Sequence, residues 1–219
     1  MKAFLSYQTQ DKQIAAEVRA FLDSISIPSF MAHEDIDVSR EWQEEILKEI
    51  VAADIFVAIL SNNYLSSYFC LQESGIAVLR KGAMTIIPLS IDGSVSPGFM
   101  GHIQSRRIQP GNISEEVLFA GVANYNADFA IDCLVNRLGS SSNYRSAEAN
   151  FQLILPYLWR ATGEQIVNIL AAAADNSQIS NAALCAREYL PPLFASHGHL
   201  LSTEVRTELG STLRRYAAP

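Results

Sequence analysis

Residues 54–77 read DIFVAILSNNYLSSYFCLQESGIA, and this stretch decides the fold. Residues 54–60 are an almost unbroken apolar run of strand length, which predicts the central strand of a parallel sheet covered on both faces. A polar loop follows at residues 61–66, and from about Ser67 the apolar residues recur at helical spacing. The stretch therefore predicts a strand, a loop and a helix in series.

Glu73 stands in the middle of the apolar arc of this helix, between Phe69 and Cys70 on one side and Ile76 and Ala77 on the other. A charge kept out of water costs several kcal/mol unless another group pairs with it or a ligand uses it. Two interpretations follow from the helix alone. The carboxylate either reaches water or a backbone amide at the rim of a buried helix, or it serves a ligand.

Strand-like and helix-like segments alternate around this stretch. Apolar runs predict further strands at residues 3–7, 27–31 and 84–91, and helical periodicity appears at 14–22 and 42–50. This alternation predicts a doubly wound α/β sheet, in which ligands bind beyond the carboxyl ends of the strands. Three polar loops, residues 7–11, 32–39 and 61–66, would meet at that edge, and Glu73 follows the last. The functional interpretation of Glu73 is therefore favoured.

The second half of the chain has a different character. The Gly/Ser-rich residues 139–146 predict a linker, so we expect a first domain at 1–138 and a helical domain at 147–219. Helical patterns cover about 147–159, 163–174, 180–194 and 203–216; a capping box begins the second at Thr162, and Pro191-Pro192 predicts a break or kink in the third. Without a catalytic constellation, this part is expected to regulate or assemble the protein.

The charge, the cysteine content and the apolar runs of the sequence argue against several classes of protein. The formal net charge of −7 argues against nucleic acid as a partner, since phosphate binding needs a clustered basic patch. Three cysteines in apolar surroundings predict reduced thiols and neither a disulfide frame nor a metal site. The sequence shows no secretory signal, and its apolar runs are too short to span a bilayer. We expect a cytoplasmic protein that does not bind membranes.

Several motifs together resemble one family. Residues 4–7 (FLSY) with Asp11, residues 30–36 (FMAHEDI) with Ser39 and Trp42, and then residues 60–64 (LSNNY), 67–73 (SYFCLQE) and 87–89 (IPL) follow in the order of a bacterial-type Toll/interleukin-1 receptor (TIR) domain. The resemblance covers about residues 1–138. It implies a flavodoxin-like parallel sheet flanked by helices, and it identifies residues 33–39 with the loop after the second strand.

The resemblance also implies a site. Glu73 matches the catalytic glutamate of the members that cleave NAD+, which would be the substrate, with no cofactor or metal required. Trp42 is expected to anchor the loop in the core, and Gln8 and Thr9 are uncharged where some members have basic residues, so the pyrophosphate would be held by backbone amides, Arg40 or a second protomer. The expected substrate-binding residues are Phe4, Tyr7, Gln8, His33, Glu34 and Phe69.

Two function classes remain open. In the first, the chain is an NAD+ glycohydrolase or cyclase of bacterial anti-phage defence, releasing nicotinamide and ADP-ribose or a cyclic isomer that a separate effector senses. In the second, it is a non-catalytic adaptor or virulence protein that acts through TIR–TIR contacts. Glu73 discriminates between them, because an adaptor needs no carboxylate in the crevice. The resemblance further implies self-association through TIR domains, and a rate that depends on protein concentration.

Overall fold

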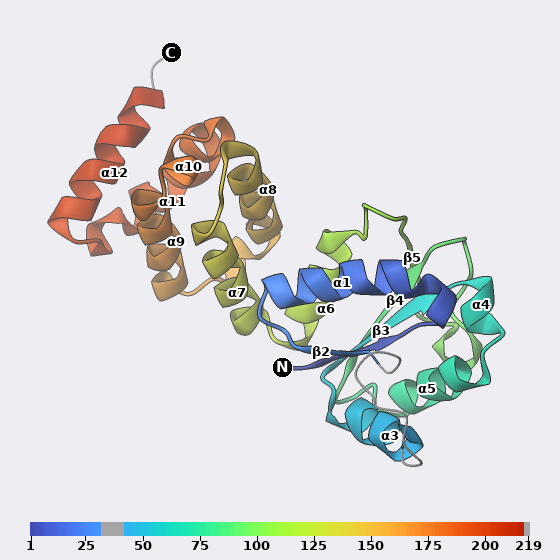
Figure 1. Ribbon diagram of the computed structural model, residues 1–219. Coiled ribbons are helices and arrows are strands. Elements are labelled where there is room, and N and C mark those ends of the chain that lie inside the picture. Colours follow the sequence, from blue (N-terminus) through green and yellow to red (C-terminus); the bar gives the residue numbers. More distant parts are fainter. Residues whose placement is uncertain (32–41, 217–219) are drawn as a thin grey trace. The chain divides into compact units, whose positions relative to one another are not determined.

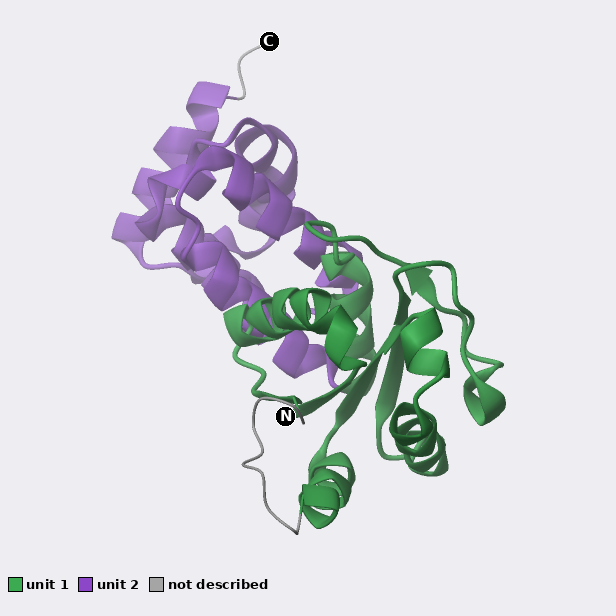
Figure 2. Cartoon of the chain, turned by 45° about the vertical axis from the view of Figure 1, so that its right-hand side comes forward, with its two compact units in different colours: residues 1–125 green, residues 126–219 purple. Residues whose placement is uncertain are grey.

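The structure, a computed structural model, describes residues 1–31 and 42–216. The chain divides into two compact units, Met1–Tyr125 and Asn126–Pro219 (Figure 2). The second unit begins before Leu138, the predicted end of the first domain. The reason is that helix α7 (Ala127–Gly139) packs against helices α8 (Tyr144–Ile154) and α9 (Gly163–Asp175).

The first unit is built on one sheet of five parallel strands. Its spatial order is β2-β1-β3-β4-β5, and the bounds are β1 Ala3–Ser6, β2 Ser29–Met31, β3 Ile55–Leu60, β4 Thr85–Ser90 and β5 Arg106–Arg107. All six residues of β3 are buried, as their apolar run predicted. This strand order is that of a doubly wound, flavodoxin-like sheet, which confirms the predicted fold class. The short edge strand β5 was not predicted, because its two arginines are exposed and carry no apolar pattern.

Helices cover both faces of this sheet (Figure 1). Helices α1 and α6 lie along one face, and α3 and α5 lie along the other. The bounds are α1 Lys12–Ser24, α3 Trp42–Ala52, α4 Asn62–Leu65, α5 Tyr68–Leu79 and α6 Glu115–Tyr125, with 3-10 turns at Thr9–Asp11 and Gly98–Met100. The cap predicted for α3, Ser39, lies outside the described residues.

The strand order reverses between β1 and β3, so the crevice expected for a ligand lies beyond their carboxyl ends. The loops that follow these two strands are tied together there. The Ser61 hydroxyl donates to the Asp11 carboxylate at 2.6 Å and accepts from the Tyr64 amide at 3.0 Å, which caps α4. Both Asp11 and Ser61 are buried, and the loops are therefore fixed relative to each other.

The second unit contains only helices among its described residues. Besides α7, α8 and α9, it has α10 Ser177–Ser180, α11 Leu190–His197 and α12 Thr203–Tyr216, with 3-10 turns at Leu155–Arg160 and Gly198–Leu200 and a π-helical turn at Cys185–Tyr189. The capping box at the start of α9 is present: the Gln165 amide donates to the Thr162 hydroxyl at 3.2 Å, and the Thr162 amide donates to Gln165 Oε1 at 3.0 Å. Pro191 and Pro192 lie in the first turn of α11, and the π-helical turn at Cys185–Tyr189 runs directly into this helix, so the pattern at 180–194 is distorted but not interrupted at the prolines.

The Gly/Ser-rich stretch predicted as a linker is a turn inside the second unit. Helix α7 ends at Gly139 and α8 begins at Tyr144. The Asn176 side-chain amide donates to the carbonyls of Gly139 at 2.8 Å and Ser141 at 2.9 Å.

No helix in residues 1–31 or 42–216 has both the length and the apolar character needed to cross a membrane.

Candidate active site

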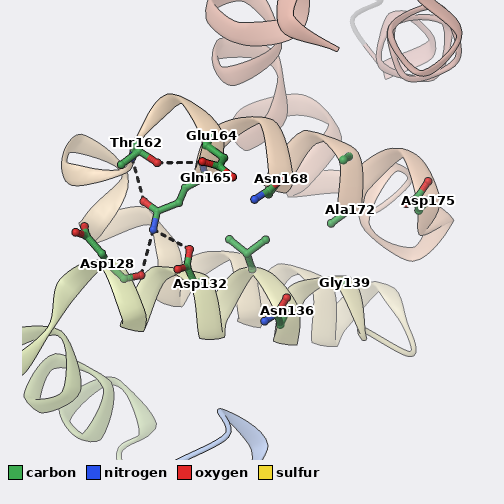
Figure 3. Close-up of a pocket in the computed structure, with 12 residues that line it drawn as sticks. Asp128, Asp132, Asn136, Gly139, Thr162, Glu164, Gln165, Asn168, Ala172 and Asp175 are labelled. Atoms are coloured by element: carbon green, nitrogen blue, oxygen red, sulfur yellow. Dashed lines mark hydrogen bonds between the residues drawn. The ribbon is translucent and has the colours of Figure 1, made fainter. Parts of the chain in front are cut away.

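The larger of two notable cavities, about 770 Å³, lies in the second unit between α7 and α9 (Figure 3). Its carboxylates, Asp128, Asp132, Glu164 and Asp175, are all exposed to water. The buried Gln165 side chain donates to the Asp128 carbonyl at 3.1 Å and to the Asp132 carboxylate at 2.8 Å, so its hydrogen bonds are made within the unit. This groove is polar and open to water, and the geometry of its described residues does not indicate a catalytic site.

The smaller cavity, about 190 Å³, lies in the first unit at the carboxyl end of β1, between α3 and α5. Four of the predicted site residues line it. The full lining is Leu5, Tyr7, Gln8, Trp42, Ile46, Ser67, Phe69, Cys70 and Glu73. The sheet topology therefore gathers residues from the first strand and from the Glu73 helix into one pocket, at the edge where the sequence predicted a ligand.

Glu73 is almost fully buried in this pocket, with 8% of its surface exposed. The Ser67 hydroxyl caps α5 by accepting from the Cys70 amide at 3.3 Å, and Glu73 lies on the buried face of this helix six residues after the cap. The Ser6 hydroxyl donates to Glu73 Oε2 at 2.5 Å. Within the described ranges no lysine or arginine pairs with the carboxylate. Burial raises the pKa of Glu73 to about 7, although the Ser6 hydrogen bond acts in the opposite direction.

Two aromatic rings form one wall of the pocket. The rings of Trp42 and Phe69 lie 4.9 Å apart between centroids at an interplanar angle of 66°, an edge-to-face contact. Phe69 keeps 46% of its surface exposed, so its ring is accessible to a ligand. Trp42 was expected to be a core anchor. It is instead half-buried at the first residue of α3 and lines the pocket.

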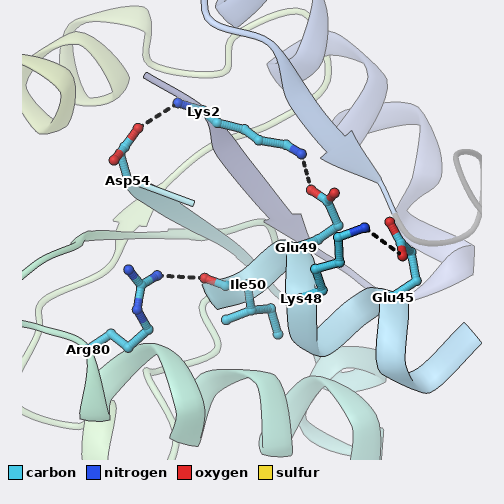
Figure 4. Close-up of polar contacts among 7 residues, drawn as sticks. All are labelled: Lys2, Glu45, Lys48, Glu49, Ile50, Asp54 and Arg80. Carbon is cyan, nitrogen blue, oxygen red and sulfur yellow. Dashed lines mark hydrogen bonds and ion pairs between the residues drawn. The ribbon is translucent and has the colours of Figure 1, made fainter. Parts of the chain in front are cut away.

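Helix α3, which carries Trp42, is held in place at its far end (Figure 4). Arg80 donates through Nη1 to the carbonyls of Ile50 at 2.6 Å and Ala53 at 2.8 Å, so a cation from the end of α5 satisfies carbonyls at the C-terminus of α3. Lys2, next to β1, pairs through its ammonium group with Glu49 of α3. These contacts fix the position of α3 relative to α5 and β1, the elements whose side chains line the pocket.

Arg80→Met is expected to destabilise the first unit by about 2 to 3 kcal/mol, because two hydrogen bonds from a charged donor to carbonyls at the end of α3 are lost. The matched control is Lys48→Met, which removes only an exposed pair with Glu45 and is expected to cost less than about 1 kcal/mol. Unfolding can be followed by Trp42 fluorescence in a Trp159→Phe background, because the chain has one tryptophan in each unit. Equal losses for the two variants would contradict this role of Arg80.

Phe4, one of the predicted site residues, does not line the described pocket. Phe4 is fully buried and stacks on Phe56, with ring centroids 5.8 Å apart and planes 5° apart, because alternate residues of β1 point to opposite faces of the sheet. It belongs to the core, and its predicted substrate contact is not supported. His33 and Glu34, together with Arg40, lie outside the described residues. Gln8 lines the pocket and also caps the turn at Thr9–Asp11 by accepting from the Gln10 amide at 3.1 Å.

Ser6 and Tyr64 belong to the site, but the sequence alone does not identify them. Both lie in the motifs FLSY and LSNNY, where a serine at a strand end and a tyrosine in a loop give no local sign that they will meet. Cys70 does line the pocket, yet burial raises the pKa of its thiol to about 11, which disfavours the nucleophilic thiolate at neutral pH.

Comparisons with known proteins find similarity to a protein family and to a solved structure. A family model described as TIR domain matches residues 3–118, just over half of the chain. Among solved structures, the TIR domain of the Toll-related receptor TRR-2 from Hydra magnipapillata is 17% identical in sequence, with a TM-score of 0.45 over 58% of this chain and 96% of that one. No curated protein sequence matches the chain significantly.

Proposed function

The chain belongs to the TIR domain family, and from that premise we propose that it cleaves the bond between nicotinamide and ribose in NAD+, with Glu73 as the catalytic carboxylate. One observation carries the proposal. Glu73 is a buried carboxyl that lines a pocket at the carboxyl end of β1, without a cationic partner among the described residues. Such burial is costly for a structural residue and is characteristic of groups that a reaction uses.

The chemistry of this cleavage suits a single carboxylate. As the glycosidic C–N bond breaks, its electron pair leaves with nicotinamide, which departs neutral, so that no general acid is needed. Positive charge develops on the ribose, and the ionised Glu73 would stabilise this oxocarbenium character and hold the ribose hydroxyls. Attack by water then gives ADP-ribose and one proton, whereas attack by the adenine of the same molecule gives a cyclic isomer and one proton.

The pocket volume bears on which part of NAD+ would enter. At about 190 Å³ it is below the roughly 300–1,000 Å³ of pockets that enclose a whole drug-sized ligand. It would therefore take only the nicotinamide and its ribose, with Phe69 and Trp42 against the rings and with Tyr7 and Gln8 at the strand end. The rest of the dinucleotide would lie outside this cavity.

Phe69→Ala is expected to lower kcat/KM for NAD+ by roughly tenfold, because an exposed aromatic surface beside Glu73 is lost, an interaction of about 1 to 1.5 kcal/mol. Phe69→Trp is expected to retain or raise the activity, since the larger ring keeps that surface. Tyr68→Ala is the control, because Tyr68 is 81% exposed on the same helix and does not line the pocket. Equal rates for wild type and both Phe69 variants would remove Phe69 from the site.

The direct test is to incubate the purified full chain with NAD+ and to measure free nicotinamide, ADP-ribose and cyclic products over a wide range of protein concentration. We expect nicotinamide release that increases more steeply than protein concentration, if self-association completes the site. The products would be candidates for sensing by a separate effector in bacterial anti-phage signalling. A failure to release nicotinamide even at high protein concentration would favour the non-catalytic adaptor role.

A further inference from the structure

We propose that Ser6 is a positioning residue for Glu73: its hydroxyl, supported by Tyr64 and Ser74 behind it, fixes the buried carboxyl in the pocket and favours its ionised form. Four side chains from three elements meet around the carboxyl of Glu73. Ser6 ends β1, Tyr64 lies in α4, and Glu73 and Ser74 lie in α5. All four are buried, and their oxygen atoms form a continuous chain.

The distances define this chain. Ser6 Oγ lies 2.5 Å from Glu73 Oε2 and 3.0 Å from the Tyr64 hydroxyl, and the Tyr64 hydroxyl lies 2.8 Å from Ser74 Oγ. The far end of the chain is the Cys70 carbonyl, 2.8 Å from Ser74 Oγ and 3.3 Å from the Tyr64 hydroxyl. Each hydroxyl is thus within reach of at least two partners without using bulk water.

The charge of Glu73 determines the direction of the first hydrogen bond. An ionised carboxylate only accepts, and each hydroxyl has a single hydrogen to donate, so Ser6 donates to Glu73. The Ser6 oxygen can then accept from Tyr64, and Ser74 can donate either to Tyr64 or to the Cys70 carbonyl. When Ser74 donates to Tyr64, every hydroxyl dipole is oriented towards the carboxylate, and successive hydrogen bonds of this kind strengthen one another.

A protonated Glu73 would allow the opposite order. The carboxyl could then donate to Ser6, Ser6 to Tyr64, Tyr64 to Ser74, and Ser74 to the Cys70 carbonyl. The same four residues can accommodate either charge state, and the ionised state depends on the Ser6 donor. Removing that donor should leave the ionised carboxylate without a hydrogen-bond partner among the described residues.

Other titratable groups face the carboxyl as well. Among the described residues, these are Tyr64 of α4, Cys70 of α5 and Tyr7 at the end of β1. Burial raises the pKa of both Tyr64 and Cys70, so these two groups are neutral near pH 7 and add no charge beside Glu73. Ser6 is then the group that most directly favours ionised Glu73.

The test follows the ionisation of Glu73 directly, by carbon-13 NMR titration of its side-chain carboxyl in the full chain, with the signal identified by its absence in Glu73→Gln. We expect the wild-type midpoint near pH 7, and an upward shift of about one pH unit in Ser6→Ala, the loss expected for one hydrogen bond to a charged group. Tyr64→Phe should shift it upward by less, Ser74→Ala by less again, and Ser6→Thr should restore the wild-type midpoint.

The effect of Ser6 on catalysis rests on the proposed NAD+ cleavage, and the pH profile of nicotinamide release should then shift with the NMR midpoint. An unchanged midpoint in Ser6→Ala would overturn the proposal even if the protein cleaves NAD+. If Ser6→Ala does not fold, an unchanged midpoint in Tyr64→Phe would overturn it equally. Shifted midpoints in a protein that never releases nicotinamide would support the role of Ser6 and reject the proposed function alone.

Discussion

Replacing Glu73 by glutamine is expected to lower nicotinamide release from NAD+ by roughly 10³-fold, the effect of removing a preorganised charge from a water-excluded site. The amide has nearly the volume of the carboxyl and can still accept from the Ser6 hydroxyl, which donates to Oε2 in the wild-type protein. The change therefore removes the charge while the pocket keeps its shape. The measurement is single-turnover release of nicotinamide at saturating NAD+, so that a binding defect is separated from a defect in bond cleavage.

Glu44→Gln is the matched control, because Glu44 is an exposed carboxylate of α3 that does not line the pocket. We expect this control to retain the wild-type rate. If the wild type releases nicotinamide, an undiminished rate in Glu73→Gln would show that Glu73 is not the catalytic group.

The same substitution is expected to stabilise the first unit at alkaline pH. Folding raises the pKa of Glu73 from 4.5 to about 7, chiefly by burial, so the folded carboxyl binds more protons than the unfolded one between these values. The free energy of unfolding of the wild type therefore decreases as the pH rises through this window, by about 3 kcal/mol in total from this group. Glutamine does not ionise, so the free energy of unfolding of the variant does not decrease in this way as the pH rises.

The expected result is a difference that depends on pH. Below about pH 4.5 both carboxyl and amide are neutral, and the two proteins should unfold at similar denaturant concentrations. At pH 8 Glu73→Gln should be the more stable, by about 3 kcal/mol. Urea unfolding monitored by Trp42 fluorescence in the Trp159→Phe background reports on the first unit. A variant less stable than the wild type at pH 8 would show that the ionised carboxylate is stabilised by the fold.

A loss of activity together with a gain of stability in Glu73→Gln would show that the ionised Glu73 serves catalysis and destabilises the fold. A buried charge without a cationic partner among the described residues lowers the stability of the native state, and an equally sized neutral side chain restores it. A structural glutamate would behave in the opposite way, because its removal would break interactions that the fold depends on.

The sequence by itself determined the parts of this protein that depend on local patterns. The apolar run at residues 54–60 predicted the buried central strand, and alternation of strand-like and helix-like segments predicted the doubly wound sheet. Helical spacing placed Glu73 on an apolar face, and parallel topology placed that face at the carboxyl edge of the sheet, where a ligand was predicted. These inferences succeed because side-chain periodicity and the handedness of crossovers are properties of the backbone, shared by every sequence with the same pattern.

Only the tertiary structure decided which side chains meet. Ser6 and Glu73 are separated by 67 positions in the sequence, yet they share a hydrogen bond. The burial of Phe4, the place of Trp42 in the pocket wall and the Arg80 contacts with the end of α3 likewise depend on the distance between elements. The physical reason is that a periodic pattern fixes the face on which a residue lies, whereas its partner, its burial and therefore its pKa are fixed by packing against segments far away in the chain.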